Sequence, residues 1–409
     1  MLTSLALIFL LGMLLSGIFK KLRLPGLIGM LLAGIIIGPH ALNLLDSSLL
    51  GISSDLRTLA LVMILLRAGL SLDIKDLKKV GRPAILMCFI PASLEMVGMI
   101  LLAPPLLGIS VLDAAIMGAV VGAVSPAVVV PKMLYLKEHR YGTDKSIPQL
   151  LIAGASVDDI YLIVMFTAFI GLAQGTQIGP TSFLPIPISI VSGLVIGIAS
   201  GVILSIVFSR FKFSDSAEVL IILSIAFLFV ALQNNTPVPF SGLLASMGMG
   251  GAVQRQRTEI AQRLSTKFSK LWVGAEILLF VLVGATVDLS YVVAAGAVVV
   301  LIIFGVLAFR MLGVFGCLVK TKLVMKERAF CMMAYMPKGT VQAAIGSIPL
   351  SLGLSCGNIV LTVAVLAIII TAPLGAICID LTYKKLLKHE PGPETGFEPG
   401  SEPSPSLQE

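Results

Sequence analysis

The sequence predicts an all-α polytopic membrane protein with about thirteen transmembrane helices arranged as two inverted repeats. Of its 409 residues 57% are hydrophobic and only 12% are charged, and the mean hydropathy is +1.03. This composition is far more apolar than that of a soluble globular domain. The apolar residues form runs long enough to cross a bilayer, and short clusters of Lys and Arg separate these runs.

Thirteen apolar spans follow one another along the chain. The first is interpreted as a membrane helix and not as a signal peptide, because its basic cluster follows the apolar run instead of preceding it. The stretch after the last span is rich in Pro, Gly and Glu, which predicts a disordered cytoplasmic tail over 390–409 behind a membrane domain over 1–389. The predicted spans are 2–19, 25–39, 56–72, 83–105, 111–133, 147–171, 185–209, 217–233, 238–253, 271–287, 291–318, 328–350 and 357–382.

Basic residues occupy every alternate loop, whereas loops such as 172–184, 234–237 and 351–356 carry almost none. This positive-inside pattern predicts an N-terminus outside and a C-terminus in the cytoplasm. The net charge of +7 therefore reflects topology, and no nucleic-acid partner is expected. The clusters are Lys20/Lys21/Arg23, Lys75/Lys78/Lys79/Arg82, Lys132/Lys137/Arg140/Lys145, Arg210/Lys212, Arg255/Arg257/Arg263/Lys267/Lys270, Lys320/Lys322/Lys326/Arg328 and Lys384/Lys385/Lys388.

Thirteen spans divide as six, one and six, and because spans 1 and 8 enter from opposite sides, the two six-helix halves have inverted topology. The fifth span of each half contains proline, in GAVSPAVVVPKM at 122–133 and YMPKGTVQAAIGSIP at 335–349. A mid-helix proline lacks an N–H and leaves a carbonyl without its partner. Either proline alone would be an ordinary kink, but broken helices at matching positions predict a binding site near the midplane.

The sixth span carries two adjacent carboxylates, Asp158 and Asp159. Asp158 lies about 11 residues into the span, roughly 16 Å at 1.5 Å per residue, near mid-membrane. A carboxylate there costs on the order of 2.5 to 3.5 kcal/mol, so the pair needs an ion-pair partner, water or a cation. The pair is either structural or a cation and proton site, and we predict the second.

Three more charged residues lie deep in their spans: Glu95, Arg310 and Lys338. With the two aspartates they make three acids and two bases, so mutual pairing would offset most of the cost of burial. Glu95 and Arg310 occupy equivalent spans of the two halves, which predicts a contact between them. Because Arg always stays charged, this contact is expected to be structural.

These segments resemble the cation:proton antiporter family, and most of all the NHA branch of sodium/proton exchangers. The resemblance rests on LLRAGLSLD, GAVSPAVVVPKM, AGASVDDIYLI and YMPKGTVQAAIGS, and it covers about residues 25–380. It implies the NhaA-type fold, with a dimerisation part in spans 1–3 and 8–10, a core part in spans 4–6 and 11–13, and span 7 as the linker.

The resemblance also implies roles for single residues. Asp158 and Asp159 match the aspartates that bind the cation and carry protons, and Val124 and Ala155 match positions whose backbone carbonyls face the cation. Ala155 stands where the closest relatives have Gly, a change that keeps the carbonyl. Glu95, Arg310 and Lys338 match the charged residues of the core. The N-terminal extension of animal members is missing, which suggests a prokaryotic plasma membrane.

The chemistry favours a secondary transporter that exchanges Na⁺ or Li⁺ for protons by alternating access, because hard cations and protons compete for the same carboxylates. A K⁺/H⁺ efflux transporter or a cation channel on the same fold is the alternative. An enzyme is not expected: an intramembrane aspartyl protease needs aspartates facing each other across two helices, whereas adjacent residues of one helix point about 100° apart. The five cysteines and three histidines lack metal-ligand spacing, so no cofactor is expected.

The expected partners are monovalent cations, protons, membrane lipid and a second copy of the chain. The resemblance implies a homodimer, and span 1 contains Gly12, Ser16 and Gly17 at a spacing that lets helices approach closely. This spacing predicts a dimer contact through span 1, with cross-links at Leu5 or Ile8.

Overall fold

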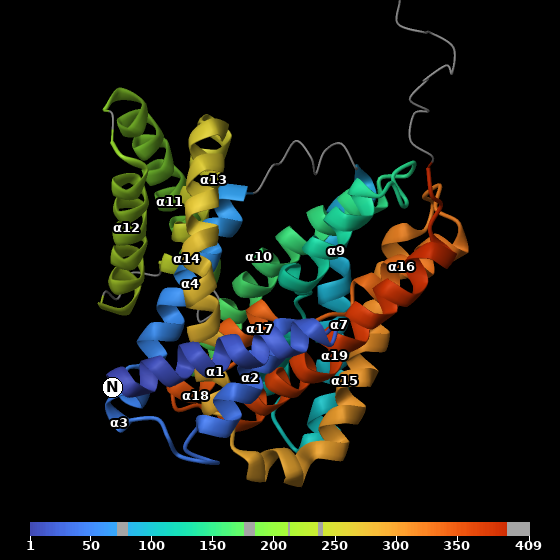
Figure 1. Ribbon diagram of the computed structural model, residues 1–409, viewed down its shortest axis with the longest axis horizontal. Helices are drawn as coiled ribbons and strands as arrows, with labels where there is room; N and C mark the ends of the chain where they lie inside the picture. Colours follow the sequence, from blue (N-terminus) through green and yellow to red (C-terminus); the bar gives the residue numbers. More distant parts are fainter. Residues whose placement is uncertain (72–80, 176–184, 212, 236–239, 391–409) are drawn as a thin grey trace, which may run out of the picture.

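The computed structural model describes residues 1–71, 81–175, 185–211, 213–235 and 240–390, and every regular element within these ranges is a helix (Figure 1). Nine helical segments of this described part are long and apolar enough to cross a membrane, so the chain is an integral membrane protein. They are α1 (Leu2–Lys21), α6 and α7 (Arg82–Met87 and Ile90–Leu107), α8 and α9 (Val111–Val121 and Pro126–Glu138), α10 (Ile147–Gln174), α11 (Pro185–Arg210), α12 (Asp215–Asn235), α14 (Thr258–Ala285), α15 (Leu289–Leu318) and α19 (Gly357–Leu386).

The other four predicted spans are helical as well, but they are short, charged or broken. The helix α4 contains Asp55, Arg57 and Arg67, and α2 and α13 have only 12 and 15 residues. A total of thirteen membrane crossings and the inverted repeat therefore stay predictions. These elements are α2 (Gly26–Ile37), α4 (Ser53–Ser71), α13 (Gly242–Gln256) and the run α16 (Met325–Ala334), α17 (Thr340–Ile345) and α18 (Ile348–Ser351).

Parts of the predicted topology fall outside the described residues: Lys75, Lys78, Lys79 and Lys212, most of the 172–184 loop, half of the 234–237 loop, and the tail from 391 onward. A short helix that the sequence did not predict, α3 (Ser47–Gly51), begins after Asp46, whose side chain accepts a hydrogen bond from the Ser48 N–H at 2.8 Å.

The fourth predicted span, 83–105, is not continuous. The helix α6 ends at Met87 and α7 begins at Ile90. Pro91 explains the break, because its ring excludes a helical hydrogen bond to the carbonyl four residues earlier, that of Met87. The Tyr335 hydroxyl donates to this carbonyl at 3.1 Å, so the carbonyl that Pro91 leaves free has a partner.

The prediction that 255–270 forms a basic loop is wrong, because α14 begins at Thr258. Ala261, Leu264 and Phe268 are buried at helical spacing, so one face of this segment packs inward. Arg263 on the other side pairs with the α12 carboxylates Asp215 at 3.0 Å and Glu218 at 2.9 Å. The basic residues thus extend a helix and do not form a loop.

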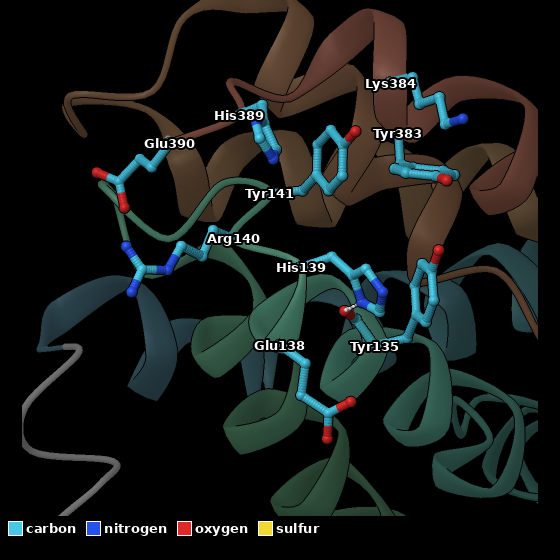
Figure 2. Close-up of a pocket in the computed structure, with 9 residues that line it drawn as sticks. All are labelled: Tyr135, Glu138, His139, Arg140, Tyr141, Tyr383, Lys384, His389 and Glu390. Atoms are coloured by element: carbon cyan, nitrogen blue, oxygen red, sulfur yellow. Dashed lines mark hydrogen bonds between the residues drawn. The ribbon is translucent and has the colours of Figure 1, made fainter. Parts of the chain in front are cut away.

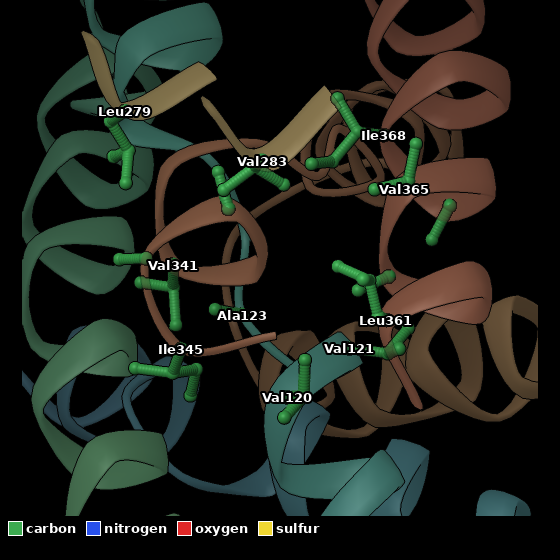
Figure 3. Packing of buried hydrophobic residues seen from close by; sticks show 14 of the residues in the cluster. Val120, Val121, Ala123, Leu279, Val283, Val341, Ile345, Leu361, Val365 and Ile368 are labelled. Atoms are coloured by element: carbon green, nitrogen blue, oxygen red, sulfur yellow. The ribbon is translucent and has the colours of Figure 1, made fainter. Parts of the chain in front are cut away.

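The helices pack as two groups (Figure 1). The α14 group comprises α1, α2, α4 and α11–α14, and at its α2–α14 crossing Gly34 and Gly284 face the opposite backbone so closely that a Cβ on either would strike it. The α10 group comprises α6–α10 and α15–α19. The groups meet where α17 packs against α4 and α14. Figure 3 shows Leu279 and Val283 of α14 in one apolar cluster with Val341 and Ile345 of α17.

The small residues of α1 do not form an outward-facing contact surface. A Cβ on Gly12 would lie 2.7 Å from Ile277 of α14, and the Ser16 side chain lies against Gly26 of α2. Ile8 is fully buried on the same face. The dimer contact predicted from Gly12 and Ser16 is therefore wrong, since their spacing serves packing within the chain. Gly17 alone has open space around its Cβ.

Candidate functional site

Two broken helices cross in the middle of the α10 group. Residues 122–125 separate α8 from α9, and residues 335–339 separate α16 from α17. The breaks lie next to the prolines from which they were predicted. The Ser125 N–H donates to the Pro337 carbonyl at 2.7 Å, so each unwound segment satisfies polar backbone of the other.

Gln342 of α17 secures this crossing. Its amide nitrogen donates to the carbonyls of Val121 at 3.0 Å and Ala123 at 2.8 Å, which are left over where α8 ends. Its amide oxygen accepts from the Gly339 N–H at 2.6 Å. Gly339 is required here for close approach, because a Cβ would strike the Ser125 hydroxyl.

Arg310 of α15 bonds to backbone carbonyls at both helix breaks and to two acidic side chains. Its guanidinium donates to Glu95 of α7 at 2.8 Å and to Asp158 of α10 at 2.7 Å. It also donates to the Gly122 carbonyl at the end of α8 and, at 2.7 Å, to the Tyr335 carbonyl at the end of α16. The predicted contact between Glu95 and Arg310 is present, and the same guanidinium also pairs with Asp158. A cation placed at two helix C-termini also offsets the negative ends of their dipoles.

Lys338 completes this arrangement from the second break. Its ammonium donates to Glu95 at 2.6 Å, and its N–H donates to the Thr371 hydroxyl of α19 at 2.9 Å. Arg310 and Lys338 together balance Glu95 and Asp158. All four side chains are at most 1% exposed, so the cluster is a buried, neutral set of ion pairs.

Asp159 is the third acid of the site, and the two bases of this ion-pair set are already paired with Glu95 and Asp158. Among the described residues none forms an ion pair with it, and its Oδ1 is buried without a hydrogen-bond partner. The same holds in the described part of the chain for Asp158 Oδ1, although Asp158 Oδ2 accepts from Arg310 and from the Val124 N–H at 3.0 Å. The Ser125 hydroxyl at the first break is a further buried oxygen without a described partner. These oxygens form a set suited to a hard cation or a proton.

The two expected carbonyl ligands are buried but differ in their setting. Val124 lies in the first break, and its N–H points at Asp158. Ala155 lies inside the continuous helix α10, where its carbonyl is placed for the N–H four residues later. The roles of the Val124 and Ala155 carbonyls as cation ligands therefore stay predictions.

Sequence reasoning missed the residues that hold the site in shape: Gln342, Tyr335, Gly122 and Ser125. Gln342 and Ser125 carried a signal, since each is a polar residue in an apolar span, with Ser125 directly before Pro126 and Gln342 three residues after Gly339. Gly122 and Tyr335 act through backbone carbonyls, which no side-chain pattern shows.

No cluster of three or more His, Cys, Asp or Glu that could hold a metal ion occurs in the described ranges. Two of the histidines lie instead in a polar pocket of about 330 Å³ at the far end of α9 (Figure 2). There Tyr141 contacts His389, with ring centroids 4.7 Å apart. The pocket is lined by Tyr135, Glu138, His139, Arg140, Tyr141, Tyr383, Lys384, His389 and Glu390.

Comparisons with known proteins agree with this architecture. A family model described as sodium/hydrogen exchanger, transmembrane, matches residues 6–385. Sodium/hydrogen exchanger 9B2 of Mus musculus is 36% identical over 354 residues, with 82% of this chain and 63% of the relative covered. Sodium/hydrogen exchanger 9B1 of Homo sapiens is 29% identical over 348 residues, covering 82% of this chain and 67% of the relative.

The chain spans less than two thirds of the length of the 9B2 relatives. A solved structure of the sodium proton antiporter MjNhaP1 from Methanocaldococcus jannaschii matches the fold with a TM-score of 0.80 at 22% identity. This match covers 94% of this chain and 98% of MjNhaP1.

Proposed function

The chain belongs to the sodium/hydrogen exchanger family, and we propose that it exchanges a monovalent cation, Na⁺ or Li⁺, for protons at Asp158 and Asp159. The observation that carries the proposal is the negative charge left over at Asp159, whose Oδ1 is buried without a described hydrogen-bond partner. Arg310 and Lys338 already neutralise Glu95 and Asp158, so an ionised Asp159 needs a further cation or a proton.

The oxygens at the site explain why binding of a cation and binding of protons would compete. Oxygens of Asp158 and Asp159, with the Ser125 hydroxyl and the backbone of the first break, suit a small hard cation. A proton on either carboxylate removes the negative charge that attracts the cation. Binding of one ligand then releases the other, which is the thermodynamic requirement of exchange.

Alternating access follows from the two helix groups in this proposal. The α10 group carries all the site residues, and it meets the α14 group mainly through apolar side chains such as Val341 and Leu279. Such a contact has few directional bonds to break when one group slides past the other. We assign the α10 group as the moving core, the α14 group without α11 as the dimerisation part, and α11, the seventh predicted span, as the connection.

Orientation and location are also part of the proposal. We propose that the N-terminus lies outside and that these helix ends lie in the cytoplasm, and the basic residues in the last turns of α1 and α19 support this orientation. The relatives reported above are from mouse and human, so the prokaryotic plasma membrane rests on the sequence prediction alone.

A transport assay tests the proposed function. The purified protein is reconstituted into liposomes with an imposed pH gradient, and a pH-sensitive dye follows proton movement after addition of Na⁺, Li⁺ or K⁺. We expect Na⁺ or Li⁺ to dissipate the gradient and Asp159→Asn to be inactive. Dissipation by K⁺ alone would indicate the K⁺/H⁺ transporter, and cation flux without proton movement would indicate a channel.

A further inference from the structure

A cleft of about 670 Å³ opens between the two helix groups, and no residue of the two breaks lines it. One wall is the α1–α2 connection, with Leu22, Arg23 and Leu24. The opposite wall comes from α9 and α19 of the α10 group, and Lys132 and Asp380 form a salt bridge of 2.5 Å on it. We call this cavity the α1–α9–α19 cleft.

The cleft lies at the level of a membrane surface. The last turns of both α1 and α19 are basic, with Lys20 and Lys21 on one and Lys384 and Lys385 on the other, as at the cytoplasmic ends of membrane helices. Tyr135 and its neighbours form an aromatic cluster there, which is typical of the layer where acyl chains meet headgroups.

The walls are apolar and exposed. Leu22 is 62% exposed, Leu381 69% and Ile377 42%, although all three line a concave surface. A bound inorganic anion would leave these side chains uncovered, whereas an acyl chain would cover them.

The charge of the cleft is positive. Asp380 is its only acidic lining residue in the part of the chain that the structure describes, and it is engaged by Lys132. Arg23, held at a φ of 62°, has no acidic partner among the described residues. The adjoining polar pocket shares Tyr135 and Tyr383 with the cleft but has as many acids as Lys and Arg residues, so an anion is drawn to the cleft.

We propose that the α1–α9–α19 cleft binds an anionic phospholipid, with its phosphate near Arg23 and Lys132 and an acyl chain along Leu22 and Ile377. Basic pockets between membrane helices at the cytoplasmic side recognise anionic headgroups in this way. Because the lipid contacts both helix groups, it braces them against each other, and this consequence alone rests on the exchange mechanism proposed above. Binding itself does not depend on that mechanism.

Binding is measured on the full chain in detergent. Phosphatidylglycerol or phosphatidylcholine is added in a titration, with retained lipid followed by native mass spectrometry and stability by the melting temperature. We expect one tightly retained phosphatidylglycerol. Arg23→Gln and Lys132→Gln should each weaken retention about fivefold, as expected for removal of one basic contact. Ile377→Trp, which fills the apolar wall without changing charge, should weaken it as well.

Matched controls separate this site from diffuse attraction. Lys21→Gln and Lys385→Gln remove the same charge from neighbouring positions that do not line the cleft, and they should retain lipid like the wild type. Equal losses in all four charge variants, or unchanged retention in Arg23→Gln and Ile377→Trp, would overturn the proposal. So would an equal rise in melting temperature with glycerol 3-phosphate, because the occupant would then be a free phosphate.

Discussion

Adjacent aspartates on one helix have different surroundings, and this difference is testable residue by residue. Asp158 accepts from Arg310 and Val124, whereas Asp159 has no described ion-pair partner. Asp159→Asn should therefore abolish exchange and leave the melting temperature unchanged or slightly raised, because it removes a partly buried charge that has no described ion-pair partner. Asp158→Asn should abolish exchange and lower the melting temperature, because a charge-assisted hydrogen bond of about 1.5–3 kcal/mol is weakened. Thermal shift and dye assays on both variants measure this contrast, and equal melting behaviour would contradict it.

Arg310 is expected to be the most costly residue of the site to remove. Arg310→Ala leaves Glu95 and Asp158 buried without their shared partner, a loss of about 3–5 kcal/mol. Glu95→Gln should cost less, since Arg310 keeps Asp158 and only Lys338 loses its acidic partner. Melting in detergent checks the order, with Lys267→Ala at a partly exposed ion pair with Asp215 as the control. A melting temperature for Arg310→Ala like that of the control would show that the pairing contributes little.

The charged residues of the site were predictable because burial of a charge in a membrane is costly and visible in a sequence. Glu95, Asp158, Arg310 and Lys338 stand out for that reason, and the structure brings all four together. The carbonyl of Gly122 was not predictable, because backbone acceptors have no sequence signature. Asp159 was predicted as an equal partner of Asp158, whereas only the structure shows which of the two is paired.

At the scale of elements, proline marked the two crossing breaks but not the gap between α6 and α7. Pro126 and Pro337 interrupt long apolar spans, so a break follows directly. Pro91 lies about two turns into its predicted span, where a single proline does not tell a kink from a break, and at this gap the Tyr335 hydroxyl bonds to the free Met87 carbonyl. The extension of α14 was missed because its basic residues suggested a loop, although apolar residues recur on one face.

The close approach of the two breaks makes Gly339 sensitive to a single methyl group. In Gly339→Ala the Cβ would strike Ser125, so the breaks must separate, and we expect a lower melting temperature and a loss of exchange. Gly296→Ala in α15, where a Cβ meets nothing within 4 Å, is the control and should be neutral or slightly stabilising. The double variant Ser125→Gly with Gly339→Ala should recover part of the stability. Wild-type melting of Gly339→Ala alone would show that the crossing is looser than described.

For the whole molecule, the structure changes where a dimer contact through α1 should be sought. Ile8, Gly12 and Ser16 face inward, whereas Leu10 and Leu14 are 63% and 58% exposed on the other face. In a cysteine-free background, Cys at Leu10 or Leu14 should form a covalent dimer and Cys at Ile8 should not. Gel electrophoresis after mild oxidation measures this. A monomer at all three positions, with transport intact, would contradict a dimer contact through α1.

The overall fold was predictable in kind because hydropathy and basic clusters reflect the bilayer directly. The division into a dimerisation part and a core part came instead from the family resemblance and stays a prediction, whereas the structure shows which helices pack against one another. The small-residue spacing of α1 shows why packing partners are harder to predict: the same spacing fits a contact within one chain or between two.

The central claim is that a cation and a proton compete for the Asp158–Asp159 pair, and proton release on cation binding measures this competition most directly. Na⁺ is titrated into the detergent-solubilised protein in a weakly buffered solution, and isothermal calorimetry in buffers of different ionisation enthalpy counts the protons released. The account predicts proton release on Na⁺ binding, weaker Na⁺ binding as the pH falls, and no release in Asp159→Asn. Sodium binding without proton release, with an affinity independent of pH, would contradict it.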